Sequence, residues 1–366
     1  MHPLSGANIG TLARVFRRGG GLNAKGAREA ALIWLAALGR WPISTAERLA
    51  LSGRLPSVDE MPPPVFILGH WRSGTTHLYN ILAKADFGYV PPLATGLPWD
   101  LLGLARAMRP FLEKALPEHR YIDKIPVNPD SPQEDEIALA NMTWISFYHG
   151  IYFPKHIEEF IREGVFFDGL GEADVASWRN TFLYFLRKLY LHQERKRLII
   201  KNPVYTARLK MLRETLPNAK FVHIHRNPYE VFASMRNFYK KLLAEFALQE
   251  YDENVIDGII LETYDRMMRA LVEDAAGLAD DVYVELRYED LDRDPLGAIR
   301  TIYDRLDLGD FERDQPRFSA YLDTVKKFEK NKFSYTDEAA EKVESRWGAF
   351  LDKWRYSRPG GEAAGA

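Results

Sequence analysis

The sequence predicts an α/β fold in which helices flank both faces of a mostly parallel central sheet. Two observations lead to this prediction: short apolar segments alternate with helix-period segments, and the predicted strands are followed closely by helix starts. We expect a helical arm over residues 1–60, one domain over residues 61–356 and a disordered tail over residues 357–366. The 366 residues suffice for a sizeable core.

Composition narrows the class of protein. Hydrophobic residues are 46% and charged residues 27%, which is ordinary for a soluble globular chain. The net charge of −2 argues against a general nucleic-acid-binding protein. The absence of cysteine excludes disulfides and thiolate metal sites and permits a reducing compartment. With no signal peptide, metal-ligand spacing or ~20-residue apolar span, we expect a cytoplasmic protein without a metal, its oligomeric state left open.

The N-terminal arm is expected to contain two helices. The first carries arginines between apolar residues, and the second runs from about Lys25 to Leu38. Two compatible interpretations are open for the arm. It packs on the domain, or its basic, Trp34-bearing face lies on the inner surface of a membrane.

The first strand of the domain, residues 65–68, leads into a loop suited to anions. Gly69 and Gly74 have the spacing of a nucleotide P-loop, but Thr75 stands where the phosphate-binding lysine of that motif belongs. The following helix offers unpaired N–H groups and the positive end of its dipole. One guanidinium and three hydroxyls add donors that suit phosphate or sulfate: Arg72, Ser73, Thr75 and Thr76.

The next stretch holds a second predicted strand and a group of acids. Residues 87–92 are expected to be a strand, and the apolar helical segment 99–108 is either an acceptor-pocket wall or ordinary core. Ser131 predicts a helix start, with a capping box that places three acids in the first turn: Glu134, Asp135 and Glu136. These acids complement the helix dipole, or one of them is a general base.

Three later apolar segments are predicted strands: 197–201, 219–225 and 282–286. Helices are expected between and after them, over residues 173–195, 202–212, 229–241, 255–278, 294–306 and 337–354.

Two of these strands end at a cation. Lys201 closes one strand, at the position where α/β sheets bind ligands, although a solvent-facing strand end is equally compatible. Arg226 directly follows the next strand, and Asn227 with Pro228 then begins a helix. Ser234 lies two turns into that helix, where a serine often bonds back to a carbonyl.

The loop Arg72-Ser73-Gly74-Thr75-Thr76 resembles the 5′-phosphosulfate loop of the sulfotransferases that use 3′-phosphoadenosine 5′-phosphosulfate (PAPS). Arg226, followed eight residues later by Ser234, matches the 3′-phosphate site of that family. The sequence Tyr288-Glu289-Asp290-Leu291 is similar to its strand-end pattern, and the resemblance spans roughly residues 62–355. It implies a P-loop NTPase-like sulfotransferase fold.

The resemblance also implies which residues bind the donor. They are the loop residues from Arg72 through His77, together with Arg226 and Ser234. Lys330 and Asn331 lie where the family has a basic loop over the 3′-phosphate and adenine, although they depart from the Arg-Lys-Gly pattern of its cytosolic animal members.

The reaction implied is in-line transfer of a sulfuryl group from PAPS to a hydroxyl, less often an amine, without a metal. Arg72 would stabilise charge on the leaving oxygen, and Lys201 is the better proton donor because arginine keeps its proton. Branches of the family use either a carboxylate or a histidine as the base. Glu136 is our first choice, and the alternatives are Glu134, Asp135, His149 and His156.

Two other functions compete with this interpretation: an ATP-dependent small-molecule kinase with a degenerate P-loop, and a non-catalytic nucleotide-binding protein at a membrane. The kinase needs a phosphate-binding lysine where Thr75 stands, and it leaves Arg226 and Ser234 unexplained. The acceptor could be a small molecule, a lipid or a glycan. Apolar and aromatic residues in the stretches 87–112 and 142–160 favour a lipid or amphiphile.

Overall fold

A computed structural model of the chain describes residues 2–114, 129–326 and 336–359. Four parallel strands form one sheet in the order β2-β1-β3-β4. The strands are β1 (Val65–Leu68), β2 (Ile199–Lys201), β3 (Lys220–His225) and β4 (Tyr283–Arg287). Because β1 and β3 are central neighbours, the segments that follow them lie at the same edge of the sheet.

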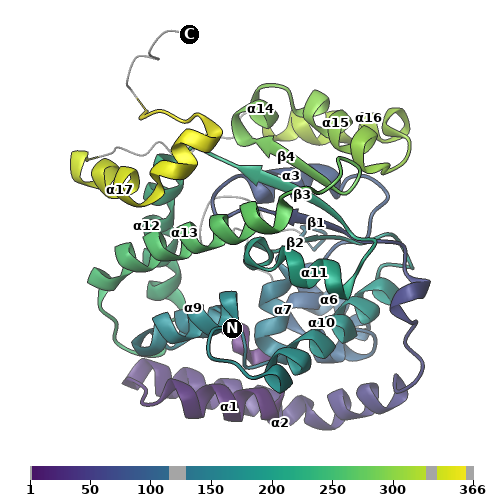
Figure 1. The fold of residues 1–366 in the computed structure, drawn as a ribbon. Coiled ribbons are helices and arrows are strands. Elements are labelled where there is room, and N and C mark those ends of the chain that lie inside the picture. Colours follow the sequence, from purple (N-terminus) through teal and green to yellow (C-terminus); the bar gives the residue numbers. More distant parts are fainter. Residues whose placement is uncertain (1, 115–128, 327–335, 360–366) are drawn as a thin grey trace.

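Helices cover both faces of the sheet, which confirms the expected α/β fold (Figure 1). Neighbouring residues of a strand point to opposite faces and therefore enter different cores. Phe66, Leu68 and Phe221 pack with α7 (Asp135–Met142), α10 (Glu172–His192) and α11 (Leu209–Thr215). Val65, Ile67 and Val222 pack with α3 (Thr75–Leu82), α15 (Pro295–Leu306) and α16 (Phe311–Val325).

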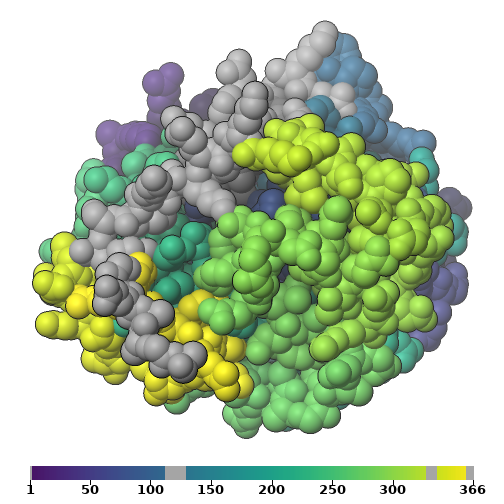
Figure 2. All heavy atoms as spheres, turned by 90° about the horizontal axis from the view of Figure 1, so that it is seen from above, coloured from purple at the N-terminus to yellow at the C-terminus, as the bar shows by residue number. Residues whose placement is uncertain are grey.

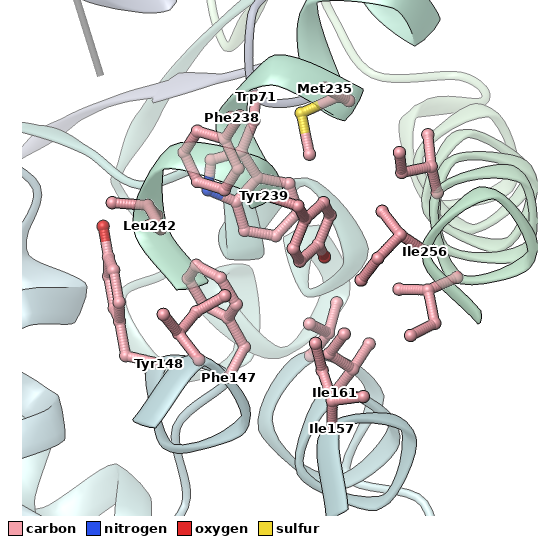
Figure 3. Packing of buried hydrophobic residues seen from close by; sticks show 14 of the residues in the cluster. Trp71, Phe147, Tyr148, Ile157, Ile161, Met235, Phe238, Tyr239, Leu242 and Ile256 are labelled. Carbon is pink, nitrogen blue, oxygen red and sulfur yellow. The ribbon is translucent and has the colours of Figure 1, made fainter. Parts of the chain in front are cut away.

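A third apolar core unites helices from both ends of the chain. Figure 3 shows part of it, where Trp71, Phe147 and Phe238 pack together. Its helices are α1 (Ile9–Gly19), α2 (Ala24–Ala50), α8 (Tyr148–Tyr152), α9 (Ile157–Phe166), α12 (Pro228–Phe246), α13 (Ile256–Ala275) and α17 (Asp337–Trp354).

Short helical segments connect these elements. The α-helical ones are α4 (Pro92–Gly96), α5 (Leu104–Ala107), α6 (Arg109–Lys114) and α14 (Tyr288–Arg293). The 3-10 turns are η1 (Pro3–Gly6), η2 (Val58–Glu60), η3 (Pro98–Asp100), η4 (Pro154–His156), η5 (Pro203–Ala207) and η6 (Glu253–Val255).

The N-terminal arm contributes side chains to the third core. Leu4, Leu12 and Ile33 are fully buried there. The Gln249 side-chain amide donates to the carbonyl oxygens of Gly19 and Gly21, at 2.7 and 2.6 Å. The arm is therefore held by packing and by long-range hydrogen bonds. Within the described ranges, no helix has both the length and the apolar content to cross a bilayer.

The strand expected over residues 87–92 is wrong. Only Gly88 pairs, in a single bridge to Leu198, and Pro92 begins α4. Proline has no N–H to donate to a strand ladder, which explains why pairing stops.

The helix expected from Ser131 starts four residues later, at Asp135, with Glu134 at the N-cap position. Glu134 bonds to Lys201 instead of closing a capping box, which explains the difference.

Other helices also differ in extent. The helix α2 runs to Ala50 rather than Leu38, continuing through Pro42, and α12 runs to Phe246 rather than residue 241. The segment 202–212 divides into η5 and α11. Most of the tail expected over 357–366 lies outside the described residues.

Candidate active site

The loop between β1 and α3 forms a tight turn at the carboxyl edge of the sheet. Ser73 closes it, since its N–H and Oγ both donate to the carbonyl oxygen of His70, at 3.2 and 2.7 Å. The Gly69 N–H donates to Thr206 Oγ1 at 2.8 Å. Arg72 has a φ of 70°, a conformation that a non-glycine residue adopts at a cost and often at functional sites.

Both loop glycines are required by close contacts. A Cβ atom on Gly69, whose φ is +141°, would lie 2.4 Å from the carbonyl oxygen of Ile224 on β3. A Cβ atom on Gly74, whose φ is +96°, would lie 2.3 Å from the ring of Tyr288. The loop is thus packed directly against β3 and against the segment that follows β4, and the start of α3, a type of site suited to anions, lies beside them.

The two predicted anion sites lie side by side. Arg72 Nε donates to Ser234 Oγ at 2.8 Å, which joins the loop to α12. The Tyr288 ring that touches Gly74 also carries the guanidinium of Arg226, 4.5 Å from its centroid. The structure therefore brings these predicted residues together at one edge of the sheet.

Arg226 is paired at only part of its guanidinium group. One of its terminal nitrogens lies 2.5 Å from Glu230 Oε2, whereas its Nε is buried and has no hydrogen-bond partner among the described residues. Asn227 caps α12 by accepting from the Tyr229 N–H, and its own amide donates to Ser357. Figure 2 shows the C-terminal segment, in yellow, against the green surface of the preceding segments. These contacts fix the turn that carries Arg226.

Glu134 and Lys201 connect the acid-bearing segment, the sheet and the loop. Lys201 Nζ lies 2.5 Å from Glu134 Oε1 and 3.3 Å from Thr76 Oγ1. The Tyr148 hydroxyl donates to Glu134 Oε2 at 3.4 Å. A carboxylate, an ammonium group and a loop hydroxyl thus meet at the N-terminus of α3. These are the groups needed to accept a proton and to stabilise a leaving phosphate.

Asp135 and Glu136 are fully buried beneath that pair. Glu136 accepts hydrogen bonds from Ser146 Oγ at 2.6 Å and from Asn202 Nδ2 at 2.9 Å. Asp135 accepts a hydrogen bond from the Tyr205 hydroxyl. Burial raises the pKa of Asp135 to about 8 and also raises the pKa of Glu136. The geometry therefore favours Glu134 as a base over Glu136, our first choice from the sequence.

The two histidine alternatives have other contacts. Both ring nitrogens of His149 lie 3.0 Å from backbone carbonyl oxygens, those of Trp144 and Ala140, and burial lowers its pKa to about 4. His156 is partly exposed, and its Nδ1 lies 3.5 Å from Glu159.

The remaining predicted donor-binding residues divide in two groups. Thr75 and His77 lie in the first turn of α3, directly after the loop. Lys330 and Asn331 lie outside the described residues. In the part of the chain that the structure describes, no group of three metal-ligating side chains is found.

Sequence reasoning missed several polar partners of the site. Tyr148, Asn202 and Thr206 contact Glu134, Glu136 and Gly69 respectively. Only Asn202 carried a signal, because it directly follows Lys201 at the end of a predicted strand. The others approach from distant segments, so no local pattern marks them.

Replacing Asp135 with asparagine is expected to flatten the fall in stability with rising pH. The pKa of Asp135 is about 8 in the folded protein against its ordinary value of 3.8, so between these values the folded state binds more protons than the unfolded state. Stability contributed by the protonated carboxyl is therefore lost as pH rises towards 8. Thermal melting at about pH 5.5 and about pH 8, both inside this window, should show a smaller difference for D135N than for wild type. Equal differences would contradict a buried, protonated Asp135.

Comparison with known proteins identifies the family of the chain. The model of the sulfotransferase family matches residues 63–313. The omega-hydroxy-beta-dihydromenaquinone-9 sulfotransferases Stf3 of Mycobacterium bovis and Mycobacterium tuberculosis are each 32% identical over 321 residues, which cover 88% of this chain and 81% of theirs.

Two solved structures share the fold. Sulfotransferase STF9 from Mycobacterium avium aligns with a TM-score of 0.70 at 16% identity, covering 97% of this chain and 98% of its own. Sulfotransferase STF1 from Mycobacterium tuberculosis aligns with a TM-score of 0.64 at 19% identity, covering 93% and 91%. Because the family model covers more than half of the chain, including both anion sites and the acids between them, the chain belongs to the sulfotransferase family.

Proposed function

We propose that this sulfotransferase transfers a sulfuryl group from PAPS to the hydroxyl of a hydrophobic lipid, of the hydroxylated menaquinone type. The observation that carries the proposal is the junction of Glu134, Lys201 and Thr76, which lies beside two adjoining anion sites. Membership in the family supplies the donor. The name of the Stf3 relatives, which act on a hydroxylated menaquinone, supports the acceptor class.

Different residues bind the two ends of the donor. The N–H groups at the start of α3, with Arg72, hold the 5′-phosphosulfate, and Arg226 with Ser234 holds the 3′-phosphate. The buried, unpartnered Nε of Arg226 among the described residues fits such a phosphate. The glycines of the loop let the backbone approach the donor closely.

Glu134 and Lys201 carry out the chemistry. Glu134 takes the proton of the acceptor hydroxyl while the acceptor oxygen bonds to sulfur. The bond from sulfur to the phosphate oxygen breaks, and adenosine 3′,5′-bisphosphate leaves. Lys201 turns from Glu134 towards that oxygen and offsets its growing negative charge, which also frees the carboxylate to act as a base.

Aromatic residues beside the carboxylate support an apolar acceptor. Tyr148, whose hydroxyl bonds to Glu134, lies 4.4 Å from the ring of Phe147, and Phe147 lies 4.7 Å from the ring of Trp71 (Figure 3). Phe147 and Trp71 are buried in the third core, so Tyr148 is the ring of this group that adjoins the carboxylate, where it suits a quinone or isoprenoid chain better than a charged glycan. A chain without cysteine also fits catalysis in the cytoplasm.

Calorimetry and a transfer assay test the proposal. Adenosine 3′,5′-bisphosphate should bind in the presence of EDTA, whereas ATP with Mg²⁺ should bind much more weakly. Labelled PAPS should pass its sulfuryl group to an ω-hydroxylated menaquinone, with little transfer to a glycan mixture. Preference for Mg²⁺-ATP would favour the kinase alternative, and binding without transfer to any hydroxyl would favour a non-catalytic protein.

A further inference from the structure

The outer face of α2 is apolar and uncovered. Six large apolar side chains of this helix are at least 42% exposed, and these six make up most of the exposed large apolar residues among the described ones: Leu32, Leu35, Leu38, Trp41, Ile43 and Leu49. An amphipathic surface helix would place charged residues here. A contiguous apolar face of this kind marks an interaction surface.

The inner face of α2 is fixed to the domain. Ile33 and Ala37 are buried, and Arg40 donates to the carbonyl oxygens of Ser5 and Ala7, at 2.7 and 2.9 Å. About two turns beyond Arg40, Glu47 pairs with the buried Lys188 at 2.7 Å. These contacts fix the orientation of α2. The helix therefore cannot rotate to bury its outer face in the core.

Charges around the apolar face select the partner. Between Glu29 and Glu47 the helix contains no acid, and Glu47 is turned inward to Lys188. Exposed cations stand at both ends of the face, Arg28 before it and Arg48 within its last turn. Residues 1–54 hold eight Lys or Arg and two Glu, whereas the whole chain has a net charge of −2. Of these cations, Arg18 pairs with Glu159 and Glu163 and Arg40 pairs with Asp100, so Arg28 and Arg48 are the exposed cations at the ends of the apolar face.

We propose that the outer face of α2 docks on an anionic lipid bilayer, with α2 lying in the interface. Apolar side chains would enter the acyl boundary, Trp41 would sit at the headgroup level and the arginines would meet lipid phosphates. This corrects the face expected from the sequence in one respect: Trp41 is 57% exposed, while Trp34 packs against Phe16.

A second copy of the chain fits this face less well. A two-fold contact brings the same surface of both copies together, so that arginines at the ends of one helix would meet arginines of the other. An anionic membrane instead pairs every exposed cation of the face with a phosphate.

Docking would also place the acid-bearing helix in a fixed relation to the bilayer. The turn η1 joins the arm to α4 and α7, since a Cβ atom on Gly6 would lie 2.0 Å from the Gly96 carbonyl oxygen and 3.0 Å from Asn141 Nδ2. Asn141 belongs to α7, the helix that Glu134 precedes. The contact thus brings a site proposed for a lipid hydroxyl to the membrane that holds the lipid, and this last step rests on the proposed function.

Vesicle sedimentation tests the docking directly. The full chain, without donor, is mixed with vesicles of phosphatidylcholine alone or with phosphatidylglycerol added. The double variant Leu35→Glu, Leu38→Glu should partition into the anionic vesicles about tenfold less than wild type, because it places two carboxylates in the apolar face. Both side chains are more than half exposed, at 66% and 52%, so the fold has little reason to change.

The matched control is Val255→Glu, which adds an acid at an exposed apolar residue of η6, outside α2, and should bind as wild type does. Equal vesicle binding by wild type and the double variant would overturn the proposal. A second result would also overturn it: wild type is a dimer in light scattering and does not bind vesicles, whereas the double variant is a monomer. A water-soluble, short-chain hydroxylated quinone separates the two proposals: the double variant should turn it over at the wild-type rate, and failure of wild type to do so would refute the acceptor class without touching the docking.

Discussion

Replacing Arg226 with alanine is expected to weaken the binding of adenosine 3′,5′-bisphosphate roughly a hundredfold, since charge-assisted hydrogen bonds to a phosphate are each worth about 1.5–3 kcal/mol. The guanidinium lies over the Tyr288 ring beside the loop, and its buried Nε lacks a partner among the described residues. Titration calorimetry at constant ionic strength measures the loss.

Arg236→Ala is the control for this change. Arg236 lies on α12, the helix that follows Arg226, but it pairs with Asp257 on α13 and not with the residues of the anion sites. The Arg236→Ala variant should bind the bisphosphate within about twofold of the wild-type affinity. A surface ion pair contributes about 0–1 kcal/mol to stability, and this one does not contact the ligand site. Melting curves of both variants separate lost binding from lost folding. A well-folded Arg226→Ala protein with wild-type affinity would show that the second anion site is misassigned.

Replacing Glu134 with glutamine is expected to lower kcat by about 10²–10⁴ while binding of the bisphosphate persists, because general base catalysis contributes about that much. The amide keeps the size of the side chain but cannot take a proton. Its oxygen can still accept from Lys201 or from Tyr148, the partners that hold the carboxylate in place. Single-turnover transfer from labelled PAPS measures the rate of the chemical step.

Glu136→Gln is the matched comparison. Both oxygens of Glu136 are already bonded, to Ser146 and to Asn202, and the side chain is fully buried. We expect this variant to lose stability more than transfer rate. Full activity of Glu134→Gln, with Glu136→Gln inactive yet folded, would return the role of base to Glu136, the residue ranked first from the sequence.

The candidate anion sites could be located from the sequence because their signals are local. A short apolar strand, a turn with two glycines and a helix start follow one another within residues 65–78, and a similar order leads from β3 to Arg226. Strand, turn and helix start fix the direction of the backbone N–H groups without help from distant residues. The contact between Arg72 and Ser234 is different, because it depends on β1 and β3 being neighbours in the sheet.

The sequence could not show which of the three adjacent acids faces Lys201. Glu134, Asp135 and Glu136 are adjacent, and only the backbone angles decide where each points. Glu134 is extended, with φ of −72° and ψ of 132°, so it faces Lys201, while the next two residues already belong to the helix. The capping rule that predicted a start at Ser131 considers local bonds alone, and a buried ion pair with β2 decided otherwise.

The way the arm is anchored bears on how the chain reaches its native state. The His2 ring contacts the carbonyl oxygen of Phe246 at 3.1 Å, and Asn23 and Gln249 tie the arm to the same late segment. On the ribosome, the first fifty residues therefore emerge long before their partners are made. Contacts between residues so far apart in the sequence form late and slowly. Until they form, the N-terminal segment exposes apolar side chains, to which a chaperone would bind.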